Sequence, residues 1–272
     1  MFSTHYAIRP DELAREAENR GFESLWLPEH THIPVDRKGP TGDPLPEEYW
    51  NTFDPFVALT AAAGATRNLR LGTGICLVVQ RDPITTAKEV ASLDFLSGGR
   101  FEFGIGGGWN REEIGNHRSD FKTRWRRLRE SVAVMKKIWT EDEPSFEGEF
   151  FRFGPMLAYP KPVQKPHPAI HLGGHGSVAL DRVVDYCDGW LPIPVRTKDL
   201  VADIAELRRR AEAAGRDPKS IAISLFMAPT DEKALHELQA LGVDRAIFRL
   251  PSESRETILP RLDDYAEVMK AL

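Results

Sequence analysis

Cysteine is scarce in this sequence. The 272 residues include two cysteines, Cys76 and Cys187, which lie far apart and have no companion at metal-ligand spacing. A disulfide framework and a zinc ribbon are therefore excluded, because each needs several cysteines at defined spacings. Both thiols are expected to be buried and unreactive.

Long hydrophobic runs and an excess of positive charge are also missing. The longest apolar run, residues 56–65, is interrupted by Thr60 and Gly64 and is too short to cross a bilayer. Residues 1–10 lack the pattern of a signal peptide. A formal net charge of -5 gives no basic field that would collect nucleic acid or anionic lipid. We therefore expect a cytoplasmic protein whose partner is a small-molecule substrate, with no nucleic acid and no membrane involved.

Short aliphatic and β-branched runs alternate with longer segments of helical periodicity. This rhythm is typical of βα units around a parallel sheet. Seven runs predict strands, at residues 24–27, 69–76, 101–105, 169–172, 189–192, 222–227 and 246–249. The pattern favours an α/β fold, a (β/α)8 TIM barrel, built as a single domain over residues 1–272.

An eighth strand is needed to close such a barrel, because an open parallel sheet leaves two unpaired edges. Only residues 1–6 are available, so the first strand is expected to be short or truncated, as it would be if the true start codon lay upstream. Two insertions follow the second and fourth strands, at residues 31–51 and 141–168. Long loops after barrel strands usually shape or cover the active site, and we expect both to do so.

One loop has the composition of a phosphate site. It consists of Gly173, Gly174, His175, Gly176 and Ser177, and it connects a predicted strand directly to a predicted helix. Glycines let the backbone approach an anion closely, and the amides and dipole of the following helix face it. The loop is therefore predicted to bind a cofactor phosphate, with the Ser177 hydroxyl as an additional donor. A tight turn without a ligand is the alternative.

A second glycine cluster follows the 101–105 strand. It contains Gly106, Gly107 and Gly108 and is followed by Trp109. Two backbones without side chains at the same end of the barrel could accommodate a flat ring, with Trp109 as a wall of the pocket or as part of the core. The acidic residue that completes a dinucleotide-binding fingerprint is missing, which excludes a Rossmann fold.

Two histidines follow the 24–27 strand. His30 is expected at the barrel mouth, where it can exchange protons near neutral pH, and the adjacent Glu29 is expected to orient the imidazole and favour its charged form. The spacing of His30 and His32 is also typical of zinc sites, so a zinc-dependent TIM-barrel hydrolase completed by His171 and His175 is an alternative. No aspartate ends the last strand, and we predict no metal site.

Four arginines lie close together in the helix that begins near residue 120: Arg124, Arg126, Arg127 and Arg129. They spread around the helix, which predicts a solvated face. The alternative is that some of them bind an anionic cofactor tail.

Several short segments occur in a characteristic order: GFESLW at 21–26, LRLGTG at 69–74, SGGR at 97–100, GIGGGW at 104–109 and LGG at 172–174. Together they resemble the luciferase-like monooxygenase superfamily, and especially its F420-dependent oxidoreductases, over nearly the whole chain. The resemblance implies a non-proline cis peptide at Gly74-Ile75 that supports the cofactor ring. It also implies that Glu29 and His30 contact the ring and that His30 is catalytic.

The resemblance implies coenzyme F420 as the cofactor and two-electron hydride transfer to or from a small organic substrate. FMN is the alternative cofactor and would permit a monooxygenase reaction. Trp109 stands where the sugar-phosphate dehydrogenases of the superfamily place a catalytic glutamate, which argues against a sugar-phosphate substrate. A non-catalytic flavin-binding barrel is a further alternative, although such a protein has no use for an ionisable residue at the ring. We expect a homodimer.

Overall fold

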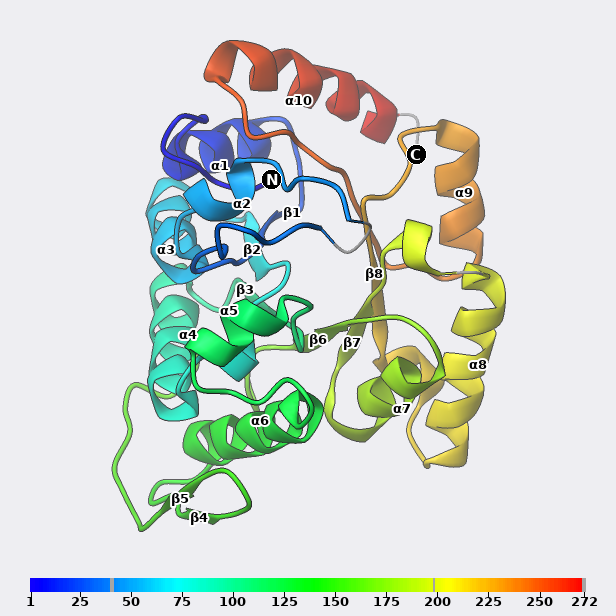
Figure 1. Ribbon diagram of the computed structural model, residues 1–272. Coiled ribbons are helices and arrows are strands. Elements are labelled where there is room, and N and C mark those ends of the chain that lie inside the picture. The colour runs from blue at the N-terminus through cyan, green and yellow to red at the C-terminus, as the bar shows by residue number, and fades with distance from the viewer. Residues whose placement is uncertain (40–41, 198, 271–272) are drawn as a thin grey trace.

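The computed structural model describes residues 1–39, 42–197 and 199–270. Seven parallel strands form one sheet in the order β1-β2-β3-β6-β7-β8-β9, and helices surround it (Figure 1). The strands are β1 (Ser24–Leu27), β2 (Arg70–Thr73), β3 (Phe101–Ile105), β6 (Ile170–Gly173), β7 (Gly189–Leu191), β8 (Ala222–Phe226) and β9 (Arg245–Ile247). All seven predicted strands are confirmed, and together with the helices they form the expected TIM-barrel architecture.

The outer helices begin where the sequence provides caps. The side chains of Asp54, Asp82, Asp199 and Asp231 each accept a backbone N–H at the start of a helix, which satisfies donors that the helix leaves free. The long helices are α1 (Pro10–Asn19), α3 (Pro55–Ala65), α4 (Pro83–Ser97), α6 (Arg124–Thr140), α7 (Ser177–Tyr186), α8 (Leu200–Ala213), α9 (Glu232–Ala240) and α10 (Arg255–Lys270). No helix in the described ranges is long and apolar enough to cross a membrane.

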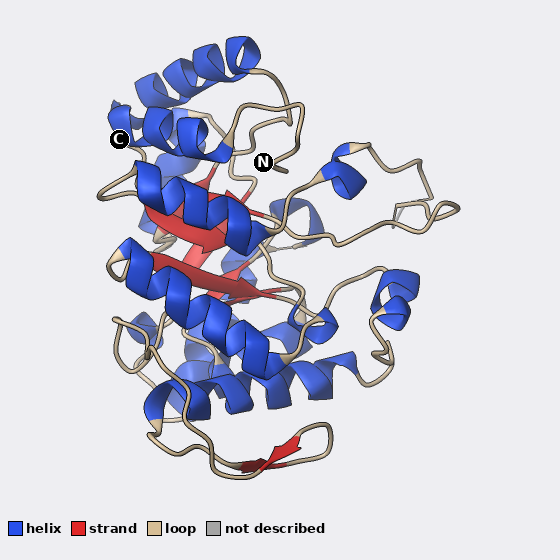
Figure 2. Ribbon diagram, turned by 90° about the vertical axis from the view of Figure 1, so that its left-hand side faces the viewer, coloured by secondary structure: helices blue, strands red, loops and turns tan. Residues whose placement is uncertain are grey.

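Shorter elements fill the connections. They are α2 (Glu48–Asn51), α5 (Arg111–Asn116), the 3-10 helices η1 (Val78–Gln80), η2 (Pro194–Arg196) and η3 (Pro218–Ser220), and the antiparallel hairpin of β4 (Phe146–Glu147) and β5 (Arg152–Phe153). Figure 2 shows the strand arrows running toward the end of the barrel where the long loops gather. In parallel barrels this is the end at which binding sites are built.

The core lies between the sheet and the helix ring. Phe101 and Phe103 of β3 are fully buried and pack against Phe56 of α3. Both cysteines are buried and free, as expected. Burial raises the pKa of the Cys187 thiol above its ordinary value, so this thiol stays protonated at neutral pH.

The prediction of a strand over residues 1–6 is wrong in this structure. Its backbone groups bond to loops instead: Phe53 donates its N–H to the Ser3 carbonyl at 2.7 Å, and Thr4 forms an isolated antiparallel bridge with Thr52. Strands β1 and β9 therefore lie at the two ends of the described strand order, and a largely apolar cavity of about 350 Å³ lies at this seam. The Arg245 side chain crosses the seam to Glu23 at 2.7 Å.

Candidate functional site

A cavity of about 560 Å³ opens at the carboxyl ends of the strands. Ten of the predicted site residues line it: Glu29, His30, Gly74, Ile75, Gly107, Gly108, Trp109, Gly173, Gly174 and His175. They come from the ends of β1, β2, β3 and β6, so four neighbouring strands converge there. The volume lies within the range of about 300–1,000 Å³ that is typical of small-molecule sites.

Ile75 forms the floor of this cavity. The Gly74-Ile75 peptide bond is cis, as expected. The Ile75 side chain lies between Gly106 and Gly173, because a Cβ atom at either glycine would lie 1.9 or 2.7 Å from it. These two glycines therefore make room for Ile75, and Gly106 lies under it rather than at the cavity surface.

Gly72 has a packing role as well. A Cβ atom at this position would lie 2.3 Å from the indole ring of Trp26. The glycine therefore makes room for a neighbouring strand's side chain.

The predicted phosphate loop is only partly directed at the cavity. Gly173, Gly174 and His175 line it, and Gly176, with a φ of +76°, leads into α7. The Ser177 hydroxyl instead accepts a hydrogen bond from Arg210 of α8 at 2.8 Å. Ser177 does not line the cavity, but its O–H is still able to donate, so its role as a donor to a cofactor phosphate stays a prediction.

Two arginines beside this loop have no acidic partner in the described part of the chain. The guanidinium of Arg182 lies 3.9 Å from the centre of the Trp125 ring, and that of Arg124 lies 5.5 Å from the same ring. Both line the cavity, and the Arg124 Nε atom is buried without a hydrogen-bond partner. Burial lowers the pKa of both guanidinium groups, and the charge of Arg182 lowers the pKa of Arg124 further.

The expectation that Arg124 belongs to a solvated face is therefore wrong. Arg126 and Arg129 do lie on the surface, where they pair with Glu149 and Asp185. Arg124 differs because it begins α6 at the cavity wall, where stacking on aromatic rings replaces an ion pair.

His30 is held by a glutamate other than the one expected. Its Nδ1 atom lies 2.8 Å from Oε2 of Glu113, which is fully buried on α5. Glu29 is committed elsewhere: its carboxylate accepts the Leu77 N–H at 2.6 Å and a guanidinium N–H of Arg81 at 2.7 Å. The prediction that Glu29 orients His30 is wrong, because Leu77 and Arg81 occupy the Glu29 carboxylate and Glu113 occupies the His30 Nδ1 atom.

Aromatic rings surround His30. The Tyr49 ring lies 5.3 Å from the imidazole, the Phe2 ring lies 6.3 Å away in a stacked arrangement, and Trp109 meets it edge-on at 5.8 Å. Tyr49 comes from the first insertion, which therefore shapes the site as expected. The second insertion supplies no described residue to the cavity, so the expectation for it is wrong. Its hairpin packs beside α6, where Glu130 accepts the N–H groups of Phe150 and Phe151.

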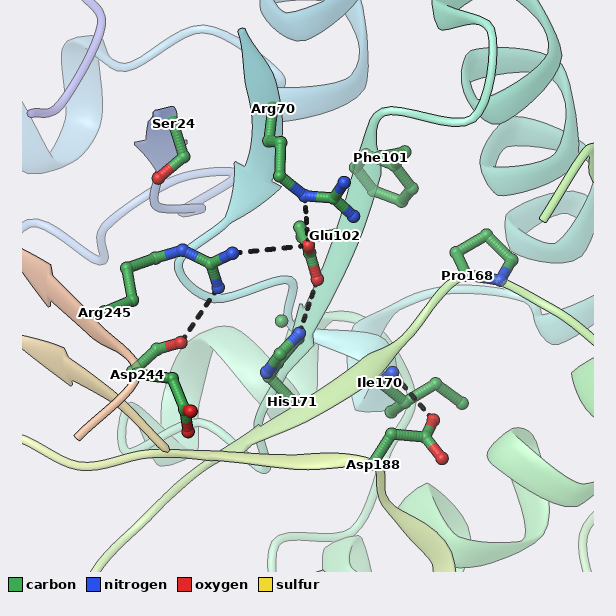
Figure 3. A network of polar contacts seen from close by, with 12 residues as sticks. Ser24, Arg70, Phe101, Glu102, Pro168, Ile170, His171, Asp188, Asp244 and Arg245 are labelled. Atoms are coloured by element: carbon green, nitrogen blue, oxygen red, sulfur yellow. Dashed lines mark hydrogen bonds and ion pairs between the residues drawn. The ribbon is translucent and has the colours of Figure 1, made fainter. Parts of the chain in front are cut away.

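His175 lines the same cavity as His30, whereas His171 and His32 do not. His171 points into the barrel, where its Nε2 atom lies 2.6 Å from Glu102 in a network with Arg70 and Arg245 (Figure 3). His32 contacts Thr31 and Asn116 outside the cavity lining. Within the described ranges, no three histidine, cysteine or acidic side chains are arranged to hold a metal ion. The ligand set of the hydrolase alternative is therefore not assembled.

Sequence reasoning missed Glu113, Arg182 and Tyr49. Glu113 lies three residues after Asn110, whose side chain caps α5 by accepting the Glu113 N–H at 3.3 Å. That spacing marks a helix start in the sequence, although it does not reveal the contact with His30. No local pattern indicates that Arg182 and Tyr49 reach the cavity.

Comparison with known proteins identifies relatives of two cofactor types. The family model for luciferase-like monooxygenases matches residues 9–272. An uncharacterized protein of Mycobacterium tuberculosis is 39% identical over 262 residues, covering 94% of this chain and 92% of that protein.

Several relatives carry cofactor names. The F420-dependent hydroxymycolic acid dehydrogenase of M. tuberculosis is 28% identical over 239 residues, or 85% of this chain and 62% of that protein. The FMNH2-dependent dimethylsulfone monooxygenase of Pseudomonas putida is 32% identical over 184 residues, or 66% of this chain and 50% of that protein. Among solved structures, the monooxygenase RslO1 of Streptomyces bottropensis has a TM-score of 0.78 at 22% identity, covering 96% and 92% of the two chains. This likeness shows the shared fold.

Proposed function

The chain belongs to the luciferase-like monooxygenase family, and from this premise we propose that it is an oxidoreductase that uses coenzyme F420 for hydride transfer to or from a small organic substrate. One observation carries the proposal. An Ile75 floor flanked by glycines, two arginines with no acidic partner among the described residues, and a buried histidine all line the same cavity.

The residues at one end of the cavity suit the cofactor phosphate. Gly173 and Gly174 present backbone near the start of α7, and Arg124 and Arg182 add two positive charges. Arginine binds phosphate through several parallel N–H groups, so these four residues are proposed to hold the anion. Glu29 is the one carboxylate among the described lining residues, and Arg81 neutralises it.

The floor suits a flat ring. Ile75 lies between Gly106 and Gly173, and no side chain from either glycine blocks the surface above it. A bound deazaflavin would supply the centre that accepts or donates a hydride. His30 lies at the aromatic wall of the same cavity and is proposed to hold or release the proton that accompanies the hydride.

FMN is the second candidate cofactor, and a flavin monooxygenase is the second candidate function. The relative from Pseudomonas putida, named as FMNH2-dependent, supports it. Backbone and arginine contacts would serve the phosphate of either cofactor. The relative named as an F420-dependent dehydrogenase covers more of this chain, 85% against 66%, and supports F420 as the first choice.

Replacement of His30 tests its assigned role. His30→Ala is expected to keep cofactor affinity within roughly tenfold while turnover falls by about 10²- to 10⁴-fold, because a general acid or base acts on the reaction and not on binding. Turnover would be measured with a substrate found in a screen of carbonyls, imines and activated alkenes.

His32→Ala is the matched control. This residue lies two positions further on and outside the cavity lining, so its replacement should be tolerated. Equal loss of activity in both variants, restored by added zinc, would support a metal-dependent hydrolase instead.

A homodimer is also part of the proposal. Exposed apolar side chains occur in α2, between α2 and α3, and near the starts of α3 and α4: Trp50, Phe53, Val57 and Ile84. A second copy would remove such side chains from water. Light scattering at the mass of two chains would support the dimer, and the mass of one chain at high concentration would refute it.

A further inference from the structure

Among the described residues, Glu113 is the one carboxylate that forms a hydrogen bond with His30. It is fully buried, and each of its two oxygens has a distinct partner. Oε2 lies 2.8 Å from the His30 Nδ1 atom, and Oε1 accepts the backbone N–H of Thr31 at 3.1 Å. An ionised carboxylate can only accept hydrogen bonds, so the ring nitrogen that faces it must carry a proton.

We propose that Glu113 is a positioning residue that fixes His30 as the Nδ1–H tautomer. In a neutral imidazole only one nitrogen carries the proton. If Glu113 holds that proton on Nδ1, the Nε2 atom presents a free lone pair, and no described residue forms a hydrogen bond with it. His30 can then accept a proton from a substrate in the cavity. This role rests on the proposed function, in which His30 exchanges a proton during hydride transfer.

The contact with Thr31 fixes which way the side chain at position 113 is oriented. The backbone N–H of Thr31 can only donate, so it requires an acceptor at the position of Oε1. In Glu113→Gln, the amide oxygen must stay at that position, and the amide nitrogen then faces Nδ1. Because this nitrogen is a donor, Nδ1 must become an acceptor and the imidazole proton must move to Nε2. The substitution preserves size and shape while it reverses the tautomer.

A reversed tautomer removes the acceptor that faces the cavity. An equivalent change at the carboxylate of a serine-protease triad leaves the geometry intact and lowers kcat by about 10⁴-fold. For Glu113→Gln we expect turnover to fall by about 10²- to 10⁴-fold with cofactor affinity nearly unchanged, because Glu113 does not line the cavity.

The decisive readout needs neither cofactor nor substrate. Nitrogen-15 NMR of histidine-labelled protein distinguishes protonated from unprotonated ring nitrogens. The His30 signals would be assigned by their loss in His30→Ala and recorded at a pH where the ring is neutral. Wild type is expected to show the proton on Nδ1, and Glu113→Gln is expected to show it on Nε2. Glu112→Gln is the control, since this neighbour is half exposed, pairs with Arg37 and should change neither tautomer nor turnover.

Each outcome decides the proposal. A proton on Nδ1 in both wild type and Glu113→Gln would overturn it, as would a reversed tautomer with full turnover. If Glu113→Gln does not fold, Glu113→Ala provides the test, because it leaves Nδ1 without a partner and should give a mixture of tautomers. Failure of wild type to bind either cofactor would refute the proposed function, and the NMR result would still report on the contact itself.

Discussion

Removal of the Arg182 charge isolates the contribution of the cofactor phosphate. In Arg182→Met the apolar stem remains over Trp125 while the guanidinium, now 3.9 Å from the ring centre, is lost. No described carboxylate loses an ion-pair partner, so folding should lose no more than the cation–π contact, about 0.5–2 kcal/mol. A hydrogen bond to a charged group contributes about 1.5–3 kcal/mol, which corresponds to an increase in Kd of roughly 10- to 100-fold.

The assay compares ligands with and without a phosphate. Fluorescence titrations would give the Kd of FMN and of riboflavin, and in parallel of F420 and the corresponding deazariboflavin. The variant should bind the phosphorylated ligand of each pair more weakly and the other nearly as well as wild type does. Arg126→Met is the control, because this arginine of α6 is exposed, pairs with Glu149 and does not line the cavity.

Two results would refute this reasoning. Equal weakening for both members of a pair would mean that Arg182 shapes the cavity instead of binding the anion. An unchanged Kd for the phosphorylated ligand would mean that the phosphate binds elsewhere.

Two further predictions concern stability. Burial alone would raise the pKa of Glu102, but the hydrogen bond and charge of His171 and the charges of Arg245 and Arg70 hold it at about 2 instead of 4.5. The ionised carboxylate therefore stabilises the fold by on the order of 3 kcal/mol above pH 4.5, and this stabilisation is lost as the pH falls toward 2. Between pH 4.5 and 2, the free energy of unfolding of Glu102→Gln should depend less on pH than that of wild type. Parallel pH curves for the two proteins would contradict the network's role. Gly72→Ala should lower the free energy of unfolding by about 1–3 kcal/mol, because the new Cβ atom would overlap Trp26. Gly64→Ala is the control and should stabilise the fold, because its Cβ atom would enter open space on α3. An unchanged denaturation midpoint in Gly72→Ala would contradict this packing account.

The strands of the barrel could be predicted because each is a short local run whose burial requires apolar residues. The same holds for the glycine clusters at the ends of β3 and β6, since their composition marks a backbone that needs close approach. The sequence of residues 1–6 alone could not show whether they form an eighth strand. Whether residues 1–6 pair with the sheet or with the loops depends on contacts with residues 52 and 53, far along the chain.

The hydrogen-bond partner of His30 could not be predicted from neighbouring residues in the sequence either. Glu29 is adjacent in sequence and was the natural candidate, yet Arg81 and the Leu77 N–H hold it, and Glu113 reaches the imidazole from a different element. Sequence proximity does not determine side-chain direction at a strand end. The position of Arg182 in the cavity could likewise not be predicted from the sequence, because it depends on how α7 lies against Trp125 of α6.

Equilibrium titration of the purified chain with F420 and with FMN tests the central claim most directly. The proposed site predicts saturable binding of F420 to one site per chain, with a change in the cofactor's absorbance as the ring leaves water, and weaker binding of FMN. Tighter binding of FMN than of F420 would contradict the cofactor assignment. Failure of both to bind would contradict the proposed function as a whole.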